Sequence, residues 1–162
     1  MVRGMIGDAT TEGTEDTEAS AGVEKNVDDA PRDRSGDNDL TSKIIAAAIE
    51  VHRQLGPGLL ESAYEACLAH ELVERGIAFE RQKLLPVQYK GITIDAGYRL
   101  DLLVERRIIV ELKAVDRLTP IHEAQMLTYL RLANCRIGLL LNFNAVVLRK
   151  GIRRMVWDPR DD

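Results

Sequence analysis

The spacing of apolar residues along the chain changes character at Leu40. From there to about Leu55 they recur every three or four positions, which predicts an amphipathic helix that Thr41 or Ser42 can cap. One face of this helix collects Ile44, Ile45, Ala48, Ile49 and His52. The segment Gly56-Pro57-Gly58 breaks the pattern, so the helix is expected to end before it.

A second helical pattern follows that break. It is expected to end at about Arg75, because Gly76 is suited to the position just after a helix. Its apolar face holds Leu60, Tyr64, Cys67, Leu68 and Leu72. The folded part of the chain therefore opens with two helices.

Beyond Gly76 the period shortens towards two, which is typical of β-strands. Three strands are expected, followed by a helix that Thr119-Pro120 opens, a buried strand and a closing hairpin. The expected boundaries are Phe79–Tyr89, Ile94–Val104 and Ile108–Ala114 for the strands, Thr119–Ala133 for the helix, Arg136–Phe143 for the buried strand, and Val146–Lys150 with Ile152–Val156 for the hairpin. This order predicts an α/β domain whose mixed sheet is flanked by helices.

Charge divides the chain into two parts. Residues 1–39 hold 4 basic and 11 acidic side chains without apolar periodicity, so they are expected to form a disordered acidic arm. Residues 40–162 hold the other 18 basic and 15 acidic side chains, a net charge of +3 that permits a phosphate-bearing partner without requiring one. The domain is therefore expected at residues 40–157, with a short tail at 158–162.

Composition narrows the class of protein. Apolar residues make up 45% of the chain, enough for a core, but no stretch approaches the roughly 18 uninterrupted apolar residues of a membrane span. Cys67 and Cys135 lie among apolar residues, which suggests buried thiols rather than a disulfide framework or a zinc site. We expect a cytoplasmic protein with no membrane partner.

Candidate chemistry lies in the hairpin of the second and third predicted strands. If its turn centres on Arg106, Asp101 lies opposite Glu111. Lys113 shares their face, because side chains alternate along a strand. The opposite face is apolar and is expected to be core, with Leu100, Leu102, Val104, Ile108, Val110, Leu112 and Ala114. The acids and the lysine are expected on a surface flanked by Leu103 and Ile109.

Two facing carboxylates with Cβ atoms about 5 Å apart repel each other, and one lysine compensates only one charge. A hard divalent cation removes the imbalance, since oxygens of Asp101 and Glu111, the Leu112 carbonyl and waters suit Mg²⁺ or Mn²⁺. Such a cation activates water and stabilises a transferring phosphoryl group. Lys113 could orient or deprotonate that water, or bind phosphate. The alternative is a structural ion pair between Lys113 and one acid.

Glu61 and His52 are weaker candidates. Glu61 lies in the first turn of the second helix, on a stripe with Tyr64, and could contact a metal-bound water. Alternatively, it only interacts with the helix dipole. His52 lies on the apolar stripe of the first helix, where a core or hydrogen-bonded histidine is expected and a role supporting Glu61 is the alternative.

Gln125 and Tyr129 lie one turn apart on the third predicted helix. They share a stripe with Ile121 and Leu132, so an amide stands where an apolar residue is expected. A buried amide needs hydrogen-bond partners. Gln125 is therefore expected either to be satisfied within the core or to orient Lys113 or a phosphate.

Five segments together carry a family resemblance. The first is Glu50–Tyr64, in which Gly58, Glu61 and Tyr64 stand at regular spacing. The others are Gly97–Val104, Val110–Ala114, His122–Gln125 and Asn142–Asn144. As a set they resemble the GxxExxY family over residues 40–157, and that family is grouped with the PD-(D/E)xK nucleases.

The resemblance implies a restriction-endonuclease-like core of order α-β-β-β-α-β, here with an extra N-terminal helix and a C-terminal hairpin. The roles that it implies are metal binding for Asp101 and Glu111, catalytic assistance for Lys113, the first-helix acid for Glu61, and the Q-x-x-x-Y element of several relatives for Gln125 with Tyr129.

The expected function is metal-dependent hydrolysis of phosphodiester bonds in nucleic acid, with DNA favoured as substrate. A homodimer or a protein partner could supply specificity, because no second domain is recognisable. Two alternatives stay open. One is a non-catalytic module that binds nucleic acid or protein on a nuclease fold, and the other is a structural protein stabilised by the ionic cluster.

Overall fold

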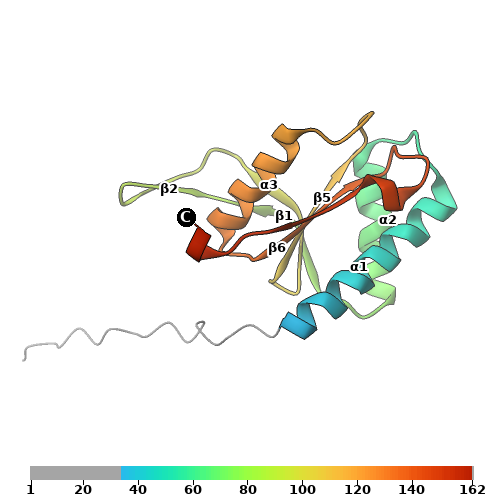
Figure 1. Ribbon diagram of the computed structural model, residues 1–162, viewed down its shortest axis with the longest axis horizontal. Coiled ribbons are helices and arrows are strands. Elements are labelled where there is room, and N and C mark those ends of the chain that lie inside the picture. Colours follow the sequence, from blue (N-terminus) through green and yellow to red (C-terminus); the bar gives the residue numbers. More distant parts are fainter. Residues whose placement is uncertain (1–33, 162) are drawn as a thin grey trace, which may run out of the picture. The chain divides into compact units, whose positions relative to one another are not determined.

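A five-stranded mixed sheet organises residues 34–161, the part of the chain that the computed structural model describes (Figure 1). Across the sheet the strands are β1 (Phe79–Leu84), β4 (Arg99–Val104), β5 (Ile108–Lys113), β6 (Ile137–Asn142) and β7 (Ile152–Val156). β5 and β6 are parallel, and the other neighbouring strands of this sheet are antiparallel. The predicted mixed α/β architecture is confirmed. Disorder was predicted for residues 1–39; residues 1–33 lie outside the described residues, and residues 34–39 are helical.

Helices cover both faces of this sheet (Figure 1). α1 (Arg34–Leu55) and α2 (Glu61–Glu74) pack on one face, and α3 (Pro120–Ala133) packs on the other. The core on the α1–α2 side includes Ile44, Leu68, Leu72, Leu102, Val110 and Leu139. The core on the α3 side includes Leu103, Ile109, Met126, Leu130 and Leu140. No helix within residues 34–161 is long and apolar enough to cross a membrane.

Local signals set the ends of α2 and α3. The side chain of Thr119 caps the first turn of α3, and the Thr119 backbone N–H donates to His122 Nδ1 at 3.0 Å. Asn134 then ends α3 with a left-handed φ of 51°. Gly76, with φ of 68°, follows α2 as predicted.

α1 begins at Arg34, well before its predicted start near Leu40, so the predicted domain boundary falls inside this helix. The carboxylate of Asp37 is buried and accepts a hydrogen bond from Arg107 Nε at 2.9 Å. Thr41, predicted to cap the helix, lies buried within it. The Asp37–Arg107 contact joins residues far apart in the chain, so no local pattern could indicate it.

The predicted strand Phe79–Tyr89 is divided in two. β1 ends at Leu84, while β2 (Val87–Tyr89) pairs with β3 (Ile92–Ile94) in a separate two-stranded sheet. Pro86 lies at the division and has no N–H to donate to a ladder. Figure 1 shows the β2–β3 hairpin projecting away from the five-stranded sheet.

The predicted closing hairpin has a strand only in its second arm. Its first arm runs into a 3₁₀ turn, η1 (Leu148–Gly151), and β7 instead pairs antiparallel with β6. Gly151 is buried, and a Cβ atom there would lie 2.6 Å from the Asn142 carbonyl oxygen. This close approach holds the turn against the end of β6. A second 3₁₀ turn, η2 (Pro159–Asp161), follows β7 in the predicted tail.

Candidate active site

Asp101 and Glu111 face each other on β4 and β5, which pair in the predicted register. The Asp101 backbone N–H donates to Glu111 Oε1 at 3.0 Å, and the Leu112 N–H donates to Asp101 Oδ2 at 2.9 Å. Each carboxylate therefore accepts a hydrogen bond from the backbone of the opposite strand. This exchange holds both side chains in place at one point of the sheet.

α3 covers this face of the sheet, which corrects two expectations. Leu103 and Ile109 are buried in the core on the α3 side and do not flank an open surface. Leu100, expected in the opposite core, packs on the α3 side as well. The side chain of Glu111 lies beneath this cover and is only 6% exposed, while Asp101 is half-buried.

Burial changes the acid–base behaviour of Glu111. Loss of solvation, and next the facing Asp101 carboxylate, raises the pKa of Glu111 to about 8, while Lys113 opposes the shift. A buried carboxylate that faces a second, half-buried one cannot ionise at low cost. A proton or a cation is therefore needed to compensate their charge.

Lys113 ends β5 on the same face as Glu111. Within residues 34–161 its ammonium forms no hydrogen bond or ion pair. The backbone that follows is held by Asn142, a buried side chain whose amide accepts from the Val115 N–H at 3.1 Å and donates to the Val115 carbonyl at 2.9 Å. Asn142 thereby orders the loop that leaves the site.

Glu61 reaches the end of β5 but does not join the two acids. Its Oε1 accepts a hydrogen bond from the Ala114 N–H at 3.1 Å, so the first turn of α2 is tied to the residue after Lys113. Within the described part of the chain, no three His, Cys, Asp or Glu side chains gather closely enough to hold a metal by themselves. Direct coordination by Glu61 together with Asp101 and Glu111 would require Glu61 to move.

A second acid of α2 approaches the site by another route. Glu65 is buried and accepts hydrogen bonds from Arg81 Nε at 3.1 Å and Gln82 Nε2 at 2.8 Å. The same Gln82 nitrogen lies 3.4 Å from Asp101 Oδ1. Sequence analysis missed both Glu65 and Gln82. Glu65 does stand one turn after Glu61, a spacing that could have indicated it.

Gln125 and Tyr129 are brought together as predicted, but in a different setting. The Gln125 amide donates to the Tyr129 hydroxyl at 2.9 Å. Gln125 is exposed and Ile121 is 71% exposed, so this stripe of α3 borders solvent instead of the core. Tyr129 itself is buried, and burial first and then Glu111 raise its pKa. Tyr129 packs in the same core cluster as Leu100 and Ile109, which lie close to Asp101 and Glu111 along β4 and β5.

His52 and Tyr64 contact the chain away from the two acids. His52 Nε2 lies 2.8 Å from the Ala145 carbonyl oxygen. The fully buried ring of Tyr64 stacks on Phe143 at 4.6 Å between centroids. The Tyr64 hydroxyl donates to the Gly56 carbonyl at 2.6 Å. Both side chains hold the α1–α2 connection and the loop after β6, a structural task.

Comparison with known families identifies the superfamily to which the chain belongs. The family model of the PD-(D/E)XK nuclease superfamily matches residues 38–155. The chain belongs to that superfamily. A search of curated proteins and a search of solved structures gave no significant match. The narrower resemblance to the GxxExxY family stays a prediction.

The fold of this PD-(D/E)XK protein is restriction-endonuclease-like, as predicted. The nucleases of this superfamily generally use divalent metals. The donors present here suit such an ion, because Asp101 and Glu111 offer carboxylate oxygens that face each other, and burial together with the facing Asp101 raises the pKa of Glu111. Mg²⁺ in particular is usually held by one or two carboxylates and keeps several waters. A partly hydrated hard cation fits this donor set.

Proposed function

We propose that this protein is a metal-dependent nuclease that hydrolyses phosphodiester bonds of nucleic acid, with DNA as the favoured substrate. The observation that carries the proposal is the pair of Asp101 and Glu111, which bond to each other's strands and bury uncompensated charge beside Lys113. Membership of the PD-(D/E)XK nuclease superfamily supports the same reaction class.

Asp101 and Glu111 would hold Mg²⁺ or Mn²⁺, together with the Leu112 carbonyl. Glu61 would act from further away through a bound water, consistent with its bond to the Ala114 N–H. When bound, such an ion supplies an activated water and stabilises negative charge on the phosphate. The ion would take the place of the proton that Glu111 otherwise retains. Its positive charge would then offset the repulsion between the two ionised acids.

Lys113 is suited to the phosphate side of the reaction. Its ammonium lies beside Glu111 and has no hydrogen-bond or ion-pair partner in residues 34–161, so it can bind a phosphate oxygen or orient the attacking water. Asn142 holds the following loop, which keeps the lysine at the end of β5. Tyr129 of α3 packs in the same core cluster as Ile109, two residues before Glu111, and Gln125 donates to the Tyr129 hydroxyl.

Substrate specificity is proposed to depend on a second protein chain. The net charge of +3 over residues 40–162 supports attraction to a polyanion, but it does not distinguish DNA from RNA. A homodimer or a protein partner would supply the additional contacts in the cytoplasm.

The test is cleavage of plasmid and single-stranded DNA with Mn²⁺ or Mg²⁺ by three variants. Asp101→Asn and Glu111→Gln should each lower the rate at least about 100-fold, because each removes a metal ligand. Glu74→Gln serves as the control, since Glu74 is an exposed carboxylate at the end of α2. Equal cutting by all variants would assign the activity to a contaminant.

A binding module would behave differently in the same preparation. It would bind DNA in a salt-dependent manner that neither EDTA nor Glu111→Gln changes, and it would cut no substrate. That combination of results would replace the proposed nuclease with a non-catalytic protein that keeps the fold.

A further inference from the structure

An open groove of about 600 Å³ lies between α3 and the residues on either side of the β2–β3 hairpin. Val87, the first residue of β2, lines the groove, and so does Tyr98, which stands just before β4. α3 contributes Ile121, Gln125, Tyr129 and Leu132. The volume lies within the range of roughly 300–1,000 Å³ in which proteins bind small organic groups.

The lining combines aromatic surface with positive charge. Tyr98 is 45% exposed at the groove, and its ring lies 6.2 Å from that of Tyr129. Arg131 also lines the groove, and no Asp or Glu does, although acids outnumber bases in the whole chain. A flat aromatic group attached to a negatively charged backbone matches this chemistry.

The groove lies on the side of the sheet that carries the candidate active site. Tyr129 forms part of its wall and packs in the same core cluster as Leu100, which adjoins Asp101, and Ile109, two residues before Glu111. Tyr98 stands shortly before Asp101 in the chain, at the start of β4. A group seated on Tyr98 would therefore lie next to the acid pair.

We propose that this groove binds an unpaired nucleobase of the substrate, stacked on Tyr98, while the adjoining phosphate lies at Asp101 and Glu111. The proposal rests on the proposed function, because it takes those acids as the place of cleavage. It names the substrate class as single-stranded nucleic acid, or a duplex end with an unpaired base. Paired bases are enclosed in their stack and would first have to be extruded.

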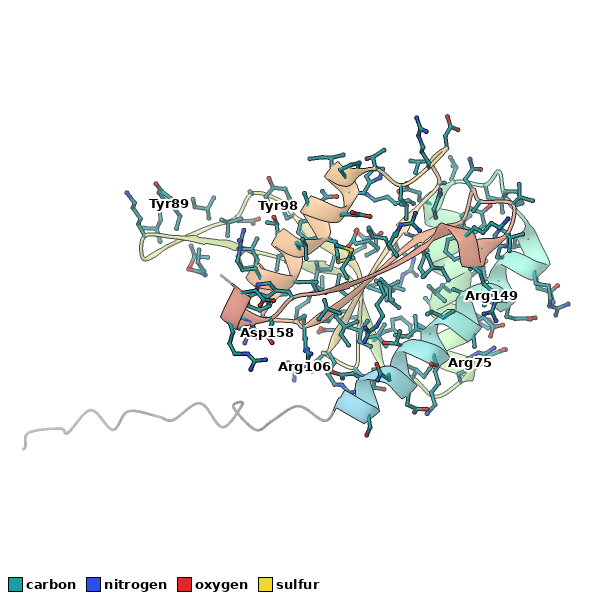
Figure 2. All side chains as sticks on the ribbon, viewed as in Figure 1. Arg75, Tyr89, Tyr98, Arg106, Arg149 and Asp158 are labelled. Atoms are coloured by element: carbon teal, nitrogen blue, oxygen red, sulfur yellow. The ribbon has the colours of Figure 1, made fainter. Side chains whose placement is uncertain are left out.

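The chain offers a matched control for Tyr98. Figure 2 shows Tyr98 beside α3 and Tyr89 out on the β2–β3 hairpin. Tyr89 is 56% exposed and does not line the groove. Both tyrosines can thus be replaced without opening a core, and only one replacement removes the stacking surface.

The experiment measures binding of a single-stranded oligonucleotide that contains 2-aminopurine, by anisotropy and by quenching of the base. Full-length protein carrying Glu111→Gln is used in EDTA, so that cleavage cannot interfere. Tyr98→Ala should weaken binding about tenfold and remove the quenching, because stacking on an aromatic side chain is lost. Tyr98→Trp should restore both, and Tyr89→Ala should leave both unchanged. The same oligonucleotide in a blunt duplex should bind more weakly.

Equal binding by Tyr98→Ala and Tyr89→Ala would overturn the proposal and would leave the groove to a partner protein. Binding of the duplex as tight as that of the single strand would overturn it as well. These outcomes are separate from the fate of the nuclease proposal. A protein that cuts DNA without any dependence on Tyr98 is a nuclease with no base site, and one that stacks a base on Tyr98 but never cuts is a binding module.

Discussion

Gln82 lies inside β1 but does not have the extended backbone of a strand residue. It has a left-handed φ of 50° in β1, and the pairing of β1 with β4 passes over it, continuing at Arg81 and Lys83. In that position its side chain links Glu65 to Asp101. Such backbone strain persists only where neighbouring contacts offset it, and it gathers at functional sites.

We expect Gln82→Ala to slow cleavage about tenfold or more while weakening DNA binding far less, because Asp101 loses a donor that sets its orientation. The measurement is kcat with Mn²⁺ beside the Kd for DNA, with Gln88→Ala on β2 as the control. Restoration of kcat by Gln82→Asn would support orientation through the amide. Equal effects of the alanine variants on kcat would contradict it.

Glu111 makes the stability of the metal-free protein depend on pH. Its pKa is raised from 4.5 to about 8, so between these values the folded state binds more protons than the unfolded chain. The stability contributed by the protonated group is therefore complete below about pH 4.5 and is lost as the pH rises through 8. Glu111→Gln should flatten this dependence in urea unfolding with EDTA from pH 5 to about pH 8. An unchanged slope would assign it to other groups.

At the scale of elements, the connection between α1 and α2 positions Glu61 relative to β5. Tyr64 closes this connection, since its hydroxyl donates to the Gly56 carbonyl and accepts from the Leu59 N–H. Gly58 within it has a φ of 101°, a conformation that other residues rarely adopt. The spacing of Gly58, Glu61 and Tyr64 thus has a structural explanation: a turn, a contact to β5 and a lock on the turn.

Tyr64→Phe should lower the free energy of unfolding by about 1–2 kcal/mol, because two backbone groups lose their partner while the ring packing remains. Urea unfolding measures the change, with the exposed Tyr89→Phe as the control. Equal stabilities of the two variants would show that the hydroxyl is not what holds the turn.

Across the whole molecule, charge is distributed unevenly. Residues 1–33 contain 3 basic and 9 acidic side chains, so their removal changes the formal net charge from -4 to +2. A more positive net charge favours association with any polyanion, and salt screens this attraction.

Deletion of residues 1–33 should tighten DNA binding several-fold in about 50 mM salt and have little effect above about 300 mM, because the interaction is electrostatic. Anisotropy titrations across a salt series measure it. A full-length variant in which six of the nine acids are replaced by their amides, which leaves residues 1–33 with no net charge, should match the deletion. If the amide variant behaves like the wild type, charge is not the cause.

The elements also differed in how well the sequence predicted their boundaries and pairing. The bounds of α3 and the register of β4 with β5 were predictable, because a cap and a tight turn act within a few residues. The division at Pro86 also has a local cause, the missing N–H of proline, but the segment was predicted as one continuous strand. The early start of α1 brings Asp37 to Arg107, a contact between distant parts of the chain that had no local signal.

The amino-acid sequence alone determined that Asp101, Glu111 and Lys113 share one face of neighbouring strands, since alternation and the position of a turn set the register. Only the tertiary structure decided that α3 covers this face, that Leu100 packs beneath it, and that Gln82 reaches Asp101. Those contacts join residues far apart in the chain. They depend on how finished elements pack together, which no local pattern of apolar and polar positions specifies.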